Sequence, residues 1–310
     1  MPPASHRPVA RRDGGSRVTR TGWPVWAAGG MAVLLGVGAL WSPRGSETDA
    51  VEATPTSAVA TRLPDLDQEA PSELEIQVET LAFGVTSYRL GFRSAVGNIG
   101  MGPLTVEASR ETETSPTMTV DQIVAVESGT SLVVPGVGQM EYAVSPQHSH
   151  WHYLDFQDYE LRSADGETVV ADRKSGFCLG DRYRVAAPTM GAAPLEPVYR
   201  GNCGPLEPAR LQIREGISVG YGDDYAAFLE GQDVSLDGLP DGRYTLVHRV
   251  NVDRSLQELS YDNNAASALL ELRWQDGTPR VRQLASCADS DECDFDPTAT
   301  VVEVPVAATI

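Results

Sequence analysis

The chain has 310 residues, 41% of them hydrophobic and 7% aromatic, which is enough for one large or two small domains with a buried core. Its formal net charge is −19, and because residues 1–22 carry five arginines against one aspartate, the remainder carries about −23. An acidic surface of this size repels nucleic acid, which excludes a nucleic-acid partner, and it attracts cationic partners such as amines. Acidity that only keeps an exported protein soluble is an equally compatible interpretation.

An uncharged segment of 19 residues, from Trp23 to Trp41, follows the basic residues 1–22. As a helix it is about 28 Å long, sufficient to cross a bilayer, and the arginines before it favour a cytoplasmic N-terminus. A cleaved signal peptide is the alternative, with Val37, Gly38 and Ala39 as a weak cleavage site. Both interpretations predict that the rest of the chain lies outside the cytoplasm, either on a single-pass membrane anchor or secreted.

The remaining chain divides by composition into three parts. Residues 42–73 are rich in Ser, Thr, Pro and acidic side chains and predict a disordered acidic linker. Over residues 74–275, short β-rich runs alternate with Gly, Pro, Asn and Asp, which predicts an all-β fold, an Ig-like β-sandwich domain. Within it, residues 243–252 and 266–274 flank a turn-rich connector and predict a long hairpin. Residues 276–310 are predicted to be a C-terminal extension closed by a disulfide.

Four cysteines allow two disulfides in three connectivities, and an oxidising compartment favours their formation. Proximity along the chain favours Cys178 with Cys203 and Cys287 with Cys293. No C-x-x-C pair occurs, so the pattern disfavours a cysteine zinc site.

The last cysteine pair lies in an acidic run whose side chains could bind calcium through Asp289, Asp291 and Asp294. The run lacks the glycine and the final glutamate of an EF-hand loop. The sequence therefore favours a solvated loop closed by a disulfide.

Three of the five histidines form an H-x-H-x-H run at His148, His150 and His152. In a strand, such alternate residues point to one face, and three imidazoles there are typical of a metal site with an open position. On a regular strand the outer two lie about 13 Å apart at Cα, too far to share one ion easily. Either the strand is distorted at 148–152, or His248 supplies one ligand. Histidines exposed on a strand face are the structural alternative.

Lys174 is the only lysine in the chain, and the other 23 basic side chains are arginine. A lysine amine can lose its proton and act as a nucleophile, whereas arginine stays protonated. The sequence therefore suggests a chemical role for Lys174, with an ordinary surface cation as the alternative.

These motifs resemble the lysyl oxidase family of copper amine oxidases. The family's copper-site histidines appear as HSHWH, and its lysine before Phe-Cys-Leu appears as Lys174-Ser-Gly-Phe-Cys-Leu. The run EGISVGYGDDYAAFLEGQDVSL is similar to the segment that holds the family's cofactor tyrosine, which falls at Tyr225, with Tyr221 as the alternative. The resemblance covers roughly residues 75–275. The high ratio of arginine to lysine, together with an anchor, is typical of a bacterial lysyl oxidase-like protein.

The resemblance implies an activity and two cofactors. It implies copper held by His148, His150 and His152, and lysine tyrosylquinone formed from Lys174 and Tyr225. The implied reaction is oxidative deamination of a primary amine or a lysine-containing protein to an aldehyde, with O2 consumed and hydrogen peroxide and ammonia released. The general base would be a nearby carboxylate, and the candidates are Asp155, Asp158, Asp223 and Asp224.

The sequence also departs from the family pattern. The tryptophan-rich segment before the histidines is replaced by EYAVSPQ, and cysteines are fewer, which leaves the substrate open. Two alternatives remain: a zinc-dependent hydrolase that uses the same histidines, and a non-catalytic extracellular module that binds copper.

Overall fold

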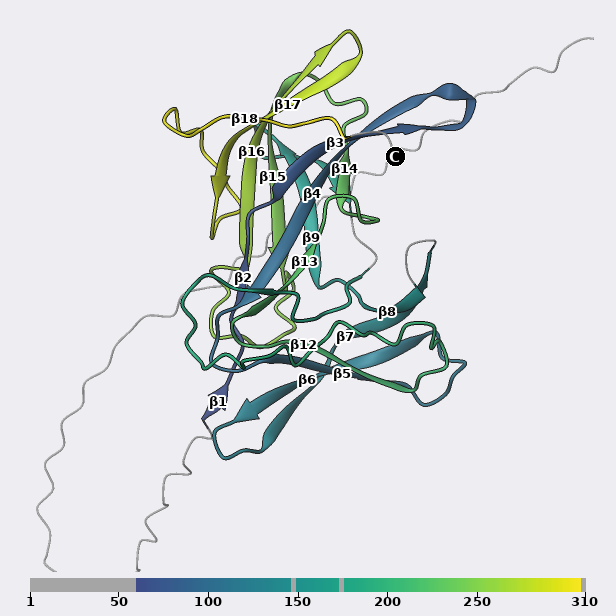
Figure 1. The fold of residues 1–310 in the computed structure, drawn as a ribbon, viewed down its shortest axis with the longest axis vertical. Coiled ribbons are helices and arrows are strands. Elements are labelled where there is room, and N and C mark those ends of the chain that lie inside the picture. Colours follow the sequence, from purple (N-terminus) through teal and green to yellow (C-terminus); the bar gives the residue numbers. More distant parts are fainter. Residues whose placement is uncertain (1–59, 146–148, 173–175, 308–310) are drawn as a thin grey trace, which may run out of the picture. The chain divides into compact units, whose positions relative to one another are not determined.

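The computed structural model describes residues 60–145, 149–172 and 176–307, all within the unit Thr56–Ile310. The predicted membrane segment, 23–41, lies outside the described residues. Within the described ranges, no helix is long and apolar enough to cross a membrane, and the helical element assigned there is the 3-10 turn η1 (Ala82–Gly84). Strands make up the regular structure, so the prediction of an all-β fold is confirmed (Figure 1).

The first sheet has the order β12-β5-β6-β7-β8, with β1 paired to β6. Every pair is antiparallel. In β6, alternate side chains are buried, which reflects the period of two read from TMTVDQIVAV. The bounds of these strands are β1 Thr61–Arg62, β5 Leu104–Ser109, β6 Thr117–Val126, β7 Ser131–Val144, β8 Ser149–Tyr153 and β12 Gln212–Ile217.

The second sheet has the order β10-β9-β15-β16-β17-β18. Strands β15 and β16 pair from Gly242 with Leu272 to Arg249 with Ala265, which confirms the predicted long hairpin. Strand β17 continues the sheet beyond residue 275 by pairing with β16, so the segment predicted as an extension adds strands to the same sheet. The bounds are β9 Gln157–Ser163, β10 Thr168–Asp172, β15 Gly242–Val250, β16 Ala265–Gln275, β17 Thr278–Cys287 and β18 Val302–Glu303.

The third sheet forms around β4, which pairs with β2, β3, β13 and β14 at different points along its length, while β11 pairs with β13. The described strands thus form three sheets, one more than an Ig-like sandwich has, because a single long strand serves two sets of partners. The bounds are β2 Leu66–Gln68, β3 Ser72–Thr80, β4 Thr86–Asn98, β11 Tyr183–Arg184, β13 Tyr221–Tyr225 and β14 Asp233–Ser235.

The predicted disordered linker, 42–73, is wrong from residue 60 onward. Strand β1 pairs with β6, and β2 pairs with β4, so distant strands order a stretch whose own composition disfavours structure. Leu66 is fully buried, and its N–H donates to the Glu258 carboxylate at 2.7 Å. Tertiary pairing here outweighs local composition.

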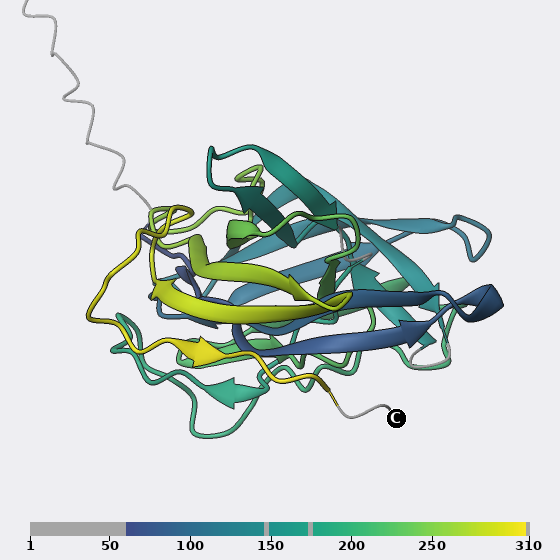
Figure 2. The same ribbon diagram turned by 90° about the horizontal axis from the view of Figure 1, so that it is seen from above.

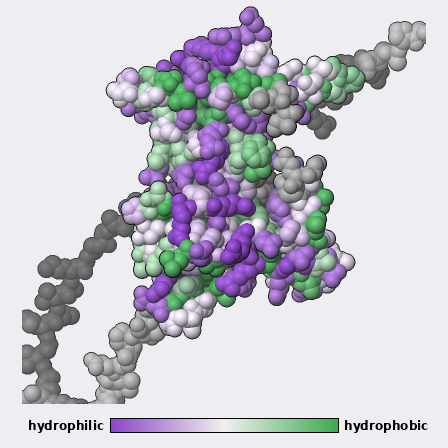
Figure 3. All heavy atoms as spheres, in the orientation of Figure 1, coloured by the Kyte–Doolittle hydropathy of each residue, from purple (hydrophilic) through white to green (hydrophobic). Residues whose placement is uncertain are grey.

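The three sheets share one hydrophobic core, to which Trp151 contributes from the first, Leu246 from the second and Phe92 from the third. Figures 1 and 2 show the β3–β4 hairpin projecting beyond the neighbouring strands. Its tip is apolar and exposed at Leu81, Phe83 and Val85. On the face drawn in Figure 3, hydrophilic residues gather over the β16–β17 end.

Candidate metal and cofactor site

Strand β8 carries two histidines of the predicted metal site on one face. His150 is half-buried and His152 is only 4% exposed, and their Nε2 atoms lie 3.0 Å apart. Trp151, between them, points the other way into the core, packed on Tyr142. The predicted alternation is therefore confirmed for these residues, whereas His148 lies outside the described residues.

The spacing of the two imidazoles fits a shared metal ion. Two nitrogens bound at about 2.0 Å, with an angle between 90° and tetrahedral, lie roughly 2.9–3.3 Å apart. In the described ranges, no group of three His, Cys, Asp or Glu side chains converges on one point. The prediction of a distorted strand involves His148 and stays a prediction.

The chain that follows Lys174 lies against the free edge of β8. Tyr153 and Phe177 exchange backbone hydrogen bonds of 2.8 and 2.9 Å. Gly176 lies so close that a Cβ built on it would be 2.6 Å from His152 Cβ, and its φ of +148° is also one that glycine favours. Lys174 itself lies outside the described residues, but residues two and three positions after it touch the histidine strand.

The Cys178–Cys203 disulfide closes the same edge. Cys203 C=O accepts the N–H of Trp151 at 2.8 Å, next to the Tyr153–Phe177 pairing. The bridge joins two chain segments that both bond to β8. Its pairing, and that of Cys287 with Cys293, confirm the pairs favoured by sequence proximity.

Tyr225 ends strand β13 and meets the segment after Lys174. Its side chain is 7% exposed, and its ring packs edge-on against Phe177, with centroids 5.2 Å apart. Cys178 N–H donates to Tyr225 Oη at 2.9 Å. The phenol proton has two acceptors within reach, Cys178 C=O at 3.0 Å and Asp223 Oδ2 at 2.9 Å.

Asp223 and Arg182 set the electrostatics around this phenol. Asp223 is fully buried and forms an ion pair with Arg182, whose guanidinium also donates to Cys178 C=O at 2.9 Å and lies over the Tyr225 ring. Burial, and then the charge of Asp223, raise the pKa of Tyr225 well above its ordinary value. The phenol is therefore protonated at neutral pH.

The other candidate bases lie elsewhere. Asp224 forms an ion pair with Arg93 at 3.0 Å. Asp155 and Asp158 line an open cleft of about 270 Å³ after the histidine strand. Of the four predicted carboxylates, Asp223 is the one bonded to Tyr225.

Tyr221, the alternative cofactor tyrosine, occupies the other end of β13. Its hydroxyl donates to Leu195 C=O at 3.3 Å, and Arg184 lies over its ring. Among the described residues, these side-chain contacts involve neither the segment after Lys174 nor the histidines, so the geometry favours Tyr225.

These features agree with the comparison with known proteins. The lysyl oxidase family model matches residues 107–283, more than half of the chain. The chain belongs to the lysyl oxidase family. The matched stretch contains the histidine run, Lys174 and Tyr225, and membership supports a copper-dependent amine oxidase function at the level of the family.

Two relatives in the family have related sequences. The chain is 27% identical to lysyl oxidase homolog 3B of Danio rerio over 141 residues, which is 42% of this chain. It is also 27% identical to lysyl oxidase homolog 2 of Gallus gallus over 139 residues, 44% of this chain. The aligned parts cover 14% and 16% of these relatives, so most of each relative lies outside the match.

His248, considered as a substitute ligand for this family's metal, has another role. It is fully buried in β15, where Gln68 Nε2 lies 2.7 Å from its Nδ1 and Gln157 Oε1 lies 3.0 Å from its Nε2. Both ring nitrogens are engaged in the core, so the geometry disfavours the alternative in which His248 supplies a metal ligand.

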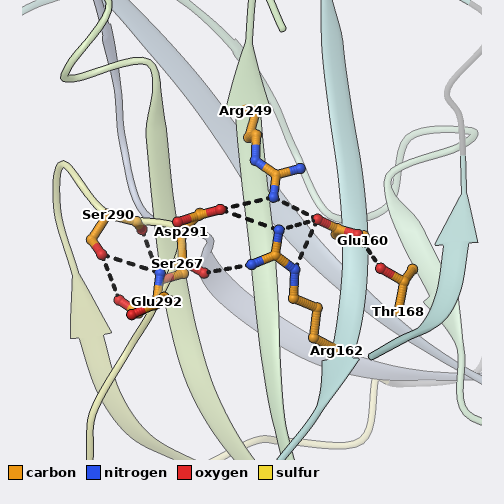
Figure 4. A network of polar contacts seen from close by, with 8 residues as sticks. All are labelled: Glu160, Arg162, Thr168, Arg249, Ser267, Ser290, Asp291 and Glu292. Atoms are coloured by element: carbon orange, nitrogen blue, oxygen red, sulfur yellow. Dashed lines mark hydrogen bonds and ion pairs between the residues drawn. The ribbon is translucent and has the colours of Figure 1, made fainter. Parts of the chain in front are cut away.

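The acidic run forms the disulfide-closed loop that the sequence favoured over a calcium site. Figure 4 shows Asp291 turned toward two arginines, Arg162 at 3.2 Å and Arg249 at 3.0 Å, which also bond to Glu160. Ser267 donates to Ser290 C=O in the same loop. Two arginines thus pair with Asp291, one of the carboxylates proposed for calcium, in the loop that the Cys287–Cys293 disulfide closes.

Two residues of the site were missed by sequence reasoning. Arg182 gave no signal, because its role depends on a carboxylate from another strand. Glu215 did have a sequence signal, because it is an acid between Ile213 and Ile217 on the buried face of β12, where the alternate residues are otherwise apolar.

Proposed function

We propose that this lysyl oxidase family member is a copper-dependent amine oxidase that converts primary amines, lysine side chains of proteins among them, to aldehydes. O2 would be the oxidant, and hydrogen peroxide and ammonia the other products. One observation carries the proposal: the segment after Lys174 lies between the histidine strand and Tyr225, touching His152 through Gly176 and Tyr225 through Cys178.

The metal would be held by His148, His150 and His152. The support is the 3.0 Å approach of two Nε2 atoms, a neutral nitrogen donor pair suited to copper. When bound, copper and a lysine tyrosylquinone made from Lys174 and Tyr225 would supply the two-electron oxidation of the amine. Burial of His152 would keep its ring in one orientation.

Lys174 would contribute its amine as the nucleophile that adds to the Tyr225 ring after that ring has been oxidised with O2. It precedes Gly176 by two residues, a stretch of backbone of at most about 7 Å. Just after Gly176, the backbone of Phe177 bonds to Tyr153 of the histidine strand and Cys178 N–H bonds to Tyr225. Arginine could not replace it, because a guanidinium stays protonated.

Asp223 would act as the general base. The proton it takes is the Cα proton of the amine substrate, and Asp223 Oδ2, at 2.9 Å from Tyr225 Oη, lies beside the ring where that amine would react. Arg182 would hold this carboxylate ionised and oriented between proton transfers. The acidic surface would draw cationic amines toward the protein.

The compartment would be outside the cytoplasm. Two disulfides support an oxidising environment, and the uncharged segment 23–41 supplies either an anchor or a signal sequence.

The full-length chain loaded with copper in air tests the function. Wild-type protein is expected to develop a visible quinone absorbance and to release peroxide when given a primary amine. Lys174→Arg and Tyr225→Phe should each abolish both signals, while Tyr221→Phe, the matched control in the same strand, should retain the quinone.

Other outcomes would identify the alternatives. Copper-loaded wild type without quinone or peroxide would contradict the proposal and indicate a copper-binding module. Hydrolytic activity with zinc that survives Lys174→Arg would indicate the hydrolase.

A further inference from the structure

An acidic side chain occupies a core position next to the proposed cofactor site. Glu215 lies on β12 between Ile213 and Ile217, on the face that the strand buries, and is only 2% exposed. A polar group here is costly unless it is bonded, so its partners indicate why an acid stands in an apolar row.

Glu215 holds the segment that follows Lys174. Its Oε2 accepts the N–H of Leu179 at 2.9 Å. Leu179 is joined directly to Cys178, whose N–H and C=O both lie within hydrogen-bond distance of Tyr225 Oη. By accepting this hydrogen bond, Glu215 therefore fixes the Cys178–Leu179 peptide, which lies next to the Tyr225 phenol.

We propose that Glu215 is a positioning residue for cofactor formation, fixing the segment Gly176–Leu179 against Tyr225 so that Lys174 can be joined to that ring. This inference rests on the proposed function. It goes further by assigning assembly of the site to Glu215, which lies on another strand, 41 positions beyond Lys174.

The protonation state of Glu215 makes a specific substitution informative. Burial raises its pKa well above the ordinary value. The hydrogen bond from Leu179 N–H opposes this, the charge of Asp223 adds to it, and the charge of Arg182 opposes it. A raised pKa favours the neutral acid. The Oε1 of Glu215 has no hydrogen-bond partner among the described residues. Glutamine, which is neutral and keeps an acceptor oxygen, should replace it with little loss.

Hydrogen exchange of the Leu179 amide in the metal-free full-length protein is the first measurement. Glu215→Leu makes the side chain apolar, like those of Ile213 and Ile217 on the same face, so the fold should persist. The substitution removes the oxygen that accepts the Leu179 N–H. Exchange at Leu179 should rise about fivefold or more, which corresponds to the usual net contribution of one hydrogen bond, while Glu215→Gln should stay within about twofold of wild type.

Quinone yield after copper and air is the second measurement. Glu215→Leu should lower the yield at least about fivefold, and Glu215→Gln should preserve it. Glu258→Leu is the matched control, because Glu258 is another buried acid that accepts a leucine N–H, that of Leu66, away from the site. It should raise exchange at Leu66 and leave the quinone yield of folded protein unchanged.

The outcomes separate this inference from the function. Wild type without quinone would refute the proposed function, and the exchange data would still decide whether Glu215 holds the segment. Wild-type quinone together with unchanged Leu179 exchange or unchanged yield in Glu215→Leu would overturn the inference alone. A Glu215→Gln variant as impaired as Glu215→Leu would also overturn it.

Discussion

Among single residues, Asp223 is the one whose environment bears most directly on chemistry. It is fully buried, yet bonded to both a cation, Arg182, and a phenol, Tyr225. A buried carboxylate needs such partners to remain ionised. Its neighbour Asp224 forms its ion pair with Arg93 and does not contact the phenol.

This contrast gives a prediction for paired substitutions. Asp223→Asn should lower amine-dependent peroxide release per quinone by about 100-fold or more, the usual contribution of a general base. It should also lower the pKa of Tyr225, because the adjacent negative charge is removed while burial remains. Asp224→Asn should stay close to wild type. Equal losses in the two variants would exclude Asp223 as the base.

Sequence reasoning at this scale succeeded where a local period decides the answer. The period of two correctly set His150 and His152 on one face, and short separation correctly paired the cysteines. It could not choose among four carboxylates, because the choice depends on which strand lies beside Tyr225. The core position of His248 could not be foreseen for the same reason: its glutamine partners come from β2 and β9.

Among the elements, the connector between β15 and β16 is organised by one acid. Glu258 accepts hydrogen bonds from Asn251, Asn264 and the Leu66 backbone, and so ties the connector to β2. The β-rich runs on either side of a turn-rich connector predicted the hairpin itself. Its attachment to β2, like the ordered structure of residues 60–73, depends on long-range contacts that composition does not reveal.

The connector should make stability depend on pH. Burial raises the pKa of Glu258 to about 7 from an ordinary 4.5, so between these values the folded chain holds a proton that the unfolded chain has lost. Its contribution to stability is therefore complete below about pH 4.5 and is lost as pH rises toward 7, by about 3 kcal/mol at most.

Urea unfolding at pH 5 and pH 8 measures this effect. The fall in free energy of unfolding between the two pH values should be smaller in Glu258→Gln than in wild type, because glutamine does not titrate. The exposed Glu303→Gln serves as control and should keep the wild-type slope. An unchanged slope in Glu258→Gln would refute the assignment.

For the whole molecule, the two disulfides have different importance. Cys178–Cys203 spans 25 residues and joins segments bonded to the histidine strand and Tyr225, whereas Cys287–Cys293 spans 6 residues and closes a surface loop. Loop-closure entropy gives about 3.5 kcal/mol for the first and about 2 kcal/mol for the second.

Paired serine substitutions should separate stability from cofactor formation. Replacing Cys178 and Cys203 should lower both the free energy of unfolding and the quinone yield of the folded protein. Replacing Cys287 and Cys293 should lower only the free energy of unfolding. Denaturant unfolding and quinone absorbance measure the two effects, and a normal quinone yield without the first bridge would show that it acts on stability alone.

The position of the Cys178–Cys203 bridge also has a consequence for whether disulfide formation or the proposed copper uptake comes first. Free thiolates are soft ligands that bind copper(I) strongly, and these two would stand beside the histidine strand. A chain that met copper before oxidation would offer the metal sulfur in competition with imidazole. Oxidation of the thiols before copper delivery would remove this competition, so we expect copper to be taken up only by chain that has formed the Cys178–Cys203 bridge.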